Sequence, residues 1–93
     1  MTFSLPTIHL NGTGAHTLYK EYRQAYESLQ TAIEALATAT CHQRDFYPQG
    51  PEAWDLAQME RREMILRLRE TQDYIQQWRN HAHDHLLSTQ HAA

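Results

Sequence analysis

The chain has 93 residues, of which 41% are hydrophobic, and its mean hydropathy is −0.73. This length is near the lower limit for a stable folded monomer, so something should supplement the core. Cys41 is the only cysteine, which excludes a disulfide within this sequence. A net charge of −3 argues against a nucleic-acid polymer as partner, because such binding uses many Lys and Arg side chains. Self-association remains the ordinary route to stability.

The sequence shows no sign of export or of membrane insertion. Its start has neither a basic head nor an apolar run, and no stretch approaches the roughly 20 apolar residues that span a bilayer. We therefore expect a cytoplasmic protein with no membrane partner.

The first half of the chain predicts an arm and a helix. Residues 1–13 should form an extended arm with Ile8 and Leu10 as apolar anchors, and the glycines around Thr13 should begin a helix near Gly14. Residues 14–40 then carry apolar side chains at alternating spacings of three and four, which is typical of an amphipathic helix. These positions are Leu18, Tyr22, Ala25, Leu29, Ala32 and Leu36.

The second half predicts a loop and a longer helix. Residues 41–50 have no period and contain Pro48 and Gly50, which favours a connecting loop. Pro51 suits the first position of a helix over 51–87, followed by a frayed tail over 88–93. The stripe of this helix comprises Trp54, Ala57, Arg61, Met64, Leu68, Thr71, Ile75, Trp78 and Ala82.

Together these elements predict an all-α fold, an antiparallel two-helix hairpin that forms a single domain over 1–93. Further residues widen both apolar stripes beyond the width that one neighbouring helix covers. They are Tyr19, Tyr26, Ile33, Ile65 and Tyr74. We therefore expect copies of the chain to assemble into a homo-oligomeric helical bundle.

Catalytic and metal-binding patterns are weak. Cys41 adjoins His42, but adjacency in a loop does not give the geometry of a nucleophile and its base, so Cys41 is better read as half-buried filler. His81 and His85 have the spacing of paired zinc ligands without an evident third ligand, and with His83 they favour a polar helix tail. We expect no enzyme, no catalytic residue, no metal and no cofactor.

Arg61 is unusual because a charge within an apolar stripe costs stability unless it is paired. An ion pair with Glu27 or Glu34 across the hairpin, or a snorkelling side chain, is slightly favoured over a ligand contact.

The turn at Asn11, Gly12 and Thr13 has two equally weighted interpretations. Glycines beside a helix start let backbone N–H groups approach an anion, but simple helix capping explains Thr13 and Gly14 equally well. Most aromatic side chains should belong to the core. Tyr19 and Tyr47 are the expected exceptions, with rings on which nucleobases can stack.

Two motifs carry a family resemblance. The run Thr7-Ile8-His9-Leu10-Asn11-Gly12-Thr13 precedes the first helix, and Arg44-Asp45-Phe46-Tyr47-Pro48-Gln49-Gly50-Pro51-Glu52-Ala53 leads into the second. With these motifs the chain resembles the hairpin domain of phage nucleotide sponges that counter the CBASS and Thoeris defences of bacteria.

The resemblance implies a non-enzymatic homo-oligomer, typically a hexamer, in the host bacterial cytoplasm. It would sequester cyclic di- and trinucleotides without cleaving them, in pockets where several hairpins meet. Asn11, Gly12 and Thr13 would contact phosphate, with Arg61 or Arg67 reaching in from another copy. The family also uses an aromatic residue and a lysine on its first helix, which Tyr19 and Lys20 would supply.

An alternative function has the same helical hairpin bind proteins and no nucleotide. The chain would then be a helical phage accessory protein, a virion-assembly factor or an inhibitor of a host protein, and its apolar stripes would serve protein contacts only.

Overall fold

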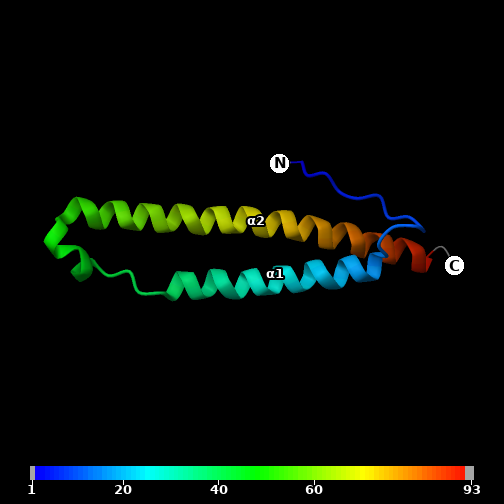
Figure 1. Cartoon of the computed structure of the whole chain (residues 1–93), viewed down its shortest axis with the longest axis horizontal. Helices are drawn as coiled ribbons and strands as arrows, with labels where there is room; N and C mark the ends of the chain where they lie inside the picture. Colours follow the sequence, from blue (N-terminus) through cyan, green and yellow to red (C-terminus); the bar gives the residue numbers. More distant parts are fainter. Residues whose placement is uncertain (1, 92–93) are drawn as a thin grey trace.

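The protein is described from a computed structural model that covers residues 2–91, with side chains described through residue 88. Helix α1 spans Ala15–Thr38, the short 3-10 helix η1 spans Gln43–Gln49, and α2 spans Pro51–His91. The two long helices lie side by side and antiparallel, with η1 at the closed end of the hairpin (Figure 1). The predicted all-α hairpin is confirmed.

The first helix has ends close to those predicted. Gly14 is its extended N-cap residue, with φ −67° and ψ 150°, and the helix ends two residues before the predicted limit of 40 because Ala39 is again extended. The predicted loop contains η1, and Gly50, with φ 94°, then redirects the chain into α2. Such a backbone angle favours glycine, because a β-carbon would be strained there.

Helix α2 runs farther than predicted. Residues 88–91 of the expected frayed tail are helical, and 92–93 lie outside the described residues. The sequence has neither glycine nor proline after Pro51, so no residue type that stops a helix follows. In the described part of the chain, neither long helix has an apolar stretch of the kind that crosses a membrane.

Contacts along the hairpin keep one antiparallel register. Tyr19 lies beside His83 with ring centroids 5.4 Å apart, and Gln72 Nε2 donates to Gln30 Oε1 at 2.7 Å. The two contacts are thus eleven residues apart along α1 and also eleven residues apart along α2. Between these pairs Tyr22 stacks on Trp78, with centroids 4.7 Å apart and planes inclined by 9°.

The core is very thin. Only Ala15, Ile33 and Ala82 are buried apolar residues among those described, and the buried polar residue is Gln72. A protein interior of this size leaves most apolar side chains partly in water, which fits the expectation that the hairpin needs a neighbour.

Three positions of the predicted stripes, Ala32, Met64 and Thr71, are exposed. Ile33, predicted to widen the first stripe, is buried, and so is Gln72, which was not predicted. Gln72 is tolerated inside because Gln30 satisfies its amide, which periodicity of apolar residues cannot reveal.

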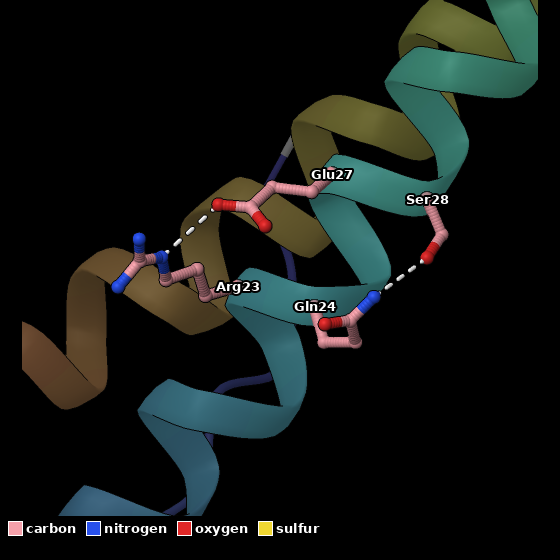
Figure 2. Close-up of polar contacts among 4 residues, drawn as sticks. All are labelled: Arg23, Gln24, Glu27 and Ser28. Atoms are coloured by element: carbon pink, nitrogen blue, oxygen red, sulfur yellow. Dashed lines mark hydrogen bonds and ion pairs between the residues drawn. The ribbon is translucent and has the colours of Figure 1, made fainter.

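The outer face of α1 is polar. Arg23 Nε donates to Glu27 Oε1 at 3.0 Å, and Gln24 Nε2 donates to Ser28 Oγ at 3.0 Å (Figure 2). The Glu27 carboxylate, through its hydrogen bond and its charge, raises the pKa of Arg23. These exposed pairs, four residues apart, are those expected of a helix surface in water.

The N-terminal arm folds back over α2 (Figure 1). Phe3 packs edge-on against Tyr74 with centroids 5.0 Å apart, and His81 Nε2 donates to the Pro6 carbonyl at 2.6 Å. The three extended residues from Phe3 to Pro6 and the seven helical residues from Tyr74 to His81 each span about 10 Å. The arm therefore runs parallel to α2 between these two contacts. The prediction that Leu10 anchors the arm is wrong, since this side chain is 98% exposed.

Candidate functional site

The turn before α1 leaves its helix end open. Gly12 N–H donates to the His9 carbonyl at 3.1 Å, and Asn11, Gly12 and Thr13 are all exposed. The N-cap Gly14 provides no side-chain capping bond, and the first turn of α1 contains no acidic residue. Of the two residues expected to cap the helix, Gly14 rather than Thr13 is the N-cap, so no side chain caps the first amides of α1.

Tyr19 and Lys20 lie one to two helical turns beyond this opening. The Tyr19 ring is half-buried and tilted by 35° against His83, so one of its faces is engaged by α2. Lys20 is exposed. Both side chains thus belong to the same end of the hairpin as the Asn11–Thr13 turn.

Arg61 closes the other end of α1. Its Nη2 donates to the Leu36 carbonyl and, at 2.6 Å, to the Ala39 carbonyl. The expected ion pair is wrong, because Glu27 binds Arg23 and Glu34 accepts from Gln30. The last carbonyls of a helix lack partners within it and carry partial negative charge, so they attract a cation placed opposite them.

A cavity of about 440 Å³ adjoins this contact. Arg61 and Arg62 contribute positive charge to it and Trp54 an aromatic wall; the full lining is Ala37, Ala39, Cys41, Trp54, Gln58, Arg61, Arg62 and Ile65. The half-buried Cys41 is one wall residue among several. In η1, Tyr47 is 68% exposed, and Phe46 packs on Trp54 with centroids 5.7 Å apart.

Arg67 lies on a different face of α2. It binds Glu63 Oε1 at 2.7 Å, and both side chains are more than half exposed. It also lines an open groove of about 870 Å³ between the arm and α2. The groove residues are Phe3, Leu66, Arg67, Arg69, Glu70, Thr71, Asp73 and Tyr74.

The predicted site residues therefore do not meet within one chain. Arg61 contacts Leu36, which lies about 32 Å along α1 from Ala15 at about 1.5 Å per residue. The turn with Tyr19 and Lys20 occupies one end, Tyr47 and Arg61 the other, and Arg67 the outer side of α2. A single ligand can contact both ends only where a second copy brings them together.

Sequence reasoning missed Trp54 and Arg62 in the cavity, and Phe3, Arg69 and Tyr74 in the groove. No sequence pattern indicates which face of α2 the arm covers.

The histidine cluster is engaged in packing. His81 holds the arm at Pro6, and His83 lies against Tyr19. Over the described part of the chain, no three His, Cys, Asp or Glu side chains are grouped so as to hold a metal ion.

Comparison of the sequence with known protein families, with curated proteins and with solved structures finds no match.

Proposed function

We propose that this chain is a nucleotide sponge: a phage-encoded homo-oligomer that binds cyclic di- or trinucleotides without cleaving them. In the host cytoplasm it would withhold these signals from a CBASS-type or Thoeris-type defence. The resemblance of the turn and loop motifs to phage sponge hairpins supports this function, and so does the placement of the turn at an uncapped helix end.

The open end of α1 is the observation that carries the proposal. A helix N-terminus presents partly positive amides, and a phosphate is the natural ligand where no side chain caps them. The exposed Thr13 adds a hydroxyl donor, and the first turn of α1 itself contains no acidic residue.

Arginine from another copy would complete the phosphate contacts. Arg61 donates to the Leu36 and Ala39 carbonyls of α1 through Nη2, and a guanidinium has further donors on Nε and Nη1. Arg67 is exposed, and its surface ion pair with Glu63 is weak enough for the guanidinium to leave it and bind a ligand. Tyr19 and Tyr47 would stack on bases, and Lys20 would add charge beside the turn. A hexamer, as in the family, would supply several such sites.

A ligand panel tests the proposal. Cyclic dinucleotides and cyclic trinucleotides should raise the melting temperature, because a ligand that binds only the folded state stabilises it. Thr13→Ala should reduce the shift, whereas Thr17→Ala, one turn later and also exposed, should leave it unchanged. After denaturation the nucleotide should be recovered intact. Linear products, or no shift with any ligand, would rule out the sponge.

A direct protein-binding role is the second candidate. Leu56, Met59 and Leu66 of α2 are 55%, 63% and 58% exposed, which is unusual for large apolar side chains and typical of contact surfaces. This function predicts no thermal shift with any cyclic nucleotide and a stable complex with a phage or host protein on pull-down.

A further inference from the structure

Helix α2 extends past the end of α1 at the closed end of the hairpin (Figure 1). Continued from the two inter-helix contacts given above, the antiparallel register sets Thr38, the last residue of α1, level with Met64. Residues 51–60 of α2 therefore lie beyond α1. The chain opposite them is η1 and the irregular segment 39–42.

The cavity of about 440 Å³ lies where α1 has ended. Ala37, Ala39 and Cys41 contribute small side chains to it, which leave space that a continued helix with larger side chains would fill. The remaining lining residues share one face of α2. They are Trp54, Gln58, Arg61, Arg62 and Ile65. A volume of this size is within the range of small-molecule sites, about 300–1,000 Å³.

The cavity is positively charged, since two arginines and no acidic residue line it. Arg61 donates to the carbonyls at the end of α1 and so offsets the negative helix end, which would otherwise repel an anion. Arg62 is exposed and forms no hydrogen bond or ion pair with another described residue. All of its N–H donors are therefore available to a ligand.

The other polar and aromatic groups of the cavity suit a flat, polar ring. Trp54 is half-buried and Phe46 packs against it, with centroids 5.7 Å apart, so the indole has a fixed position. Aromatic side chains of this kind stack on nucleobases. Among the described residues the Gln58 side chain has no hydrogen-bond partner, and its amide offers both donor and acceptor groups to the edge of a base.

The spacing of these groups matches a ligand with an anion at one end and a ring at the other. Arg62 and Trp54 are eight residues apart, about 12 Å along the helix axis, and Gln58 lies midway between them. An extended arginine side chain and a nucleotide together bridge this distance.

From this combination we infer that the cavity binds a nucleoside monophosphate within a single chain. Arg62 holds the phosphate, Trp54 stacks on the base, and Gln58 hydrogen-bonds its edge. The inference goes beyond the proposed function, because this site lies at the closed end of the hairpin and needs neither a second copy nor the Asn11–Thr13 turn. A nucleoside without phosphate, or phosphate without a base, makes only part of these contacts.

Tryptophan fluorescence tests the site directly, because Trp54 and Trp78 are the two tryptophans of the chain. In a Trp78→Phe variant only Trp54 emits, and the ring that stacks on Tyr22 is kept. Adenosine monophosphate should quench this emission saturably, since a base stacked on an indole quenches it. Adenosine and inorganic phosphate should each bind at least about tenfold more weakly, with phosphate detected by competition.

The reciprocal variant is the control for the position of the ligand. In Trp54→Phe the remaining emission comes from Trp78, which packs between the helices against Tyr22, and adenosine monophosphate should leave it unchanged. Equal quenching in the two variants, or quenching in Trp78→Phe that does not saturate below about 1 mM, would overturn the site.

Removal of Arg62 separates ligand binding from stability. In the Trp78→Phe background, Arg62→Gln should weaken binding of adenosine monophosphate about tenfold or more, because a charge-assisted contact to phosphate is lost. The urea midpoint of the ligand-free chain should stay nearly unchanged, because Arg62 has no partner in the described chain. Arg69→Gln is the matched control: Arg69 is exposed on the same helix and lines the groove instead of the cavity. Equal weakening by both substitutions would reject the site.

The cavity site and the sponge fail separately. Thr13→Ala should leave quenching by adenosine monophosphate unchanged, because Thr13 lies at the other end of the hairpin. Saturable quenching together with no thermal shift from any cyclic nucleotide would keep the cavity site and remove the sponge. A thermal shift from cyclic nucleotides without this quenching would keep the sponge and remove the cavity site.

Discussion

Arg61 and Ala39 are joined across the hairpin by a hydrogen bond of 2.6 Å from the guanidinium Nη2 to the carbonyl oxygen. Nη2 also donates to the Leu36 carbonyl, so one cation serves the last turn of α1. Helix ends left without partners cost free energy, and the negative end of the helix dipole favours a positive charge. This explains why an arginine is retained within the apolar stripe of α2.

Removing this cap should destabilise the hairpin. Arg61→Leu keeps an apolar stem but leaves the Leu36 and Ala39 carbonyls without the donor, which we expect to cost about 1–3 kcal/mol of unfolding free energy. Urea denaturation at matched protein concentration measures this. Arg62→Leu changes the neighbouring, exposed arginine and should lower the unfolding free energy much less. Equal losses in the two variants would argue against the capping role.

The hairpin and its helix starts could be read from sequence because they depend on local signals. Apolar residues at spacings of three and four, Gly14 and Pro51 each act within a few residues. The partner of Arg61 could not be read, since it depends on which turn of α1 lies opposite, and the expected Glu27 and Glu34 are displaced by backbone carbonyls.

The candidate site was only partly predictable for the same reason. The start of α1 beside Thr13 is a local feature, and the sequence indicated its position. The arm groove depends on Phe3 meeting Tyr74, residues far apart in the chain, so only the tertiary structure brings its walls together.

The Gln30–Gln72 pair should behave as a unit. Gln72→Leu alone removes the donor to Gln30 Oε1 and should cost about 1 kcal/mol or more, because a partly buried amide loses its partner. Replacing both residues by leucine should recover most of the loss. A double-mutant cycle from urea denaturation measures the coupling. Additive losses would show that the two side chains act independently.

The arm should detach when its aromatic contact is removed. Phe3→Ala abolishes the edge-on packing against Tyr74, a type of contact that contributes about 0.5–1.5 kcal/mol beyond burial. Hydrogen exchange of residues 2–9 should quicken while that of α1 is unchanged. Leu10→Ala, at a side chain that is 98% exposed, is the control and should alter neither rate. Unchanged exchange in Phe3→Ala would show that the Pro6–His81 bond alone holds the arm.

Tyr22 should make the hairpin sensitive to alkali. Burial against Trp78, followed by the neighbouring Tyr74 and Glu21, raises the pKa of Tyr22 above its ordinary value of 10.0. As pH rises past about 10, tyrosine in the unfolded chain loses its proton first, so the unfolded state binds fewer protons than the folded one. Unfolding is then favoured. The stability is intact below about pH 10 and is lost as the pH rises toward the raised folded pKa.

Tyr22→Phe removes this ionisable group and keeps the ring that stacks on Trp78. Melting temperatures from about pH 8.5 to about 11.5 should therefore fall less steeply in Tyr22→Phe than in the parent chain. Tyr47→Phe, which removes an exposed phenol on η1, is the matched control for the loss of one tyrosine. Because the stacked pair lies between the Gln30–Gln72 and Tyr19–His83 contacts, ionisation of Tyr22 should loosen both neighbours at once. If the melting temperature depends on pH identically in the parent chain and in Tyr22→Phe, the loss of stability at high pH comes from another group.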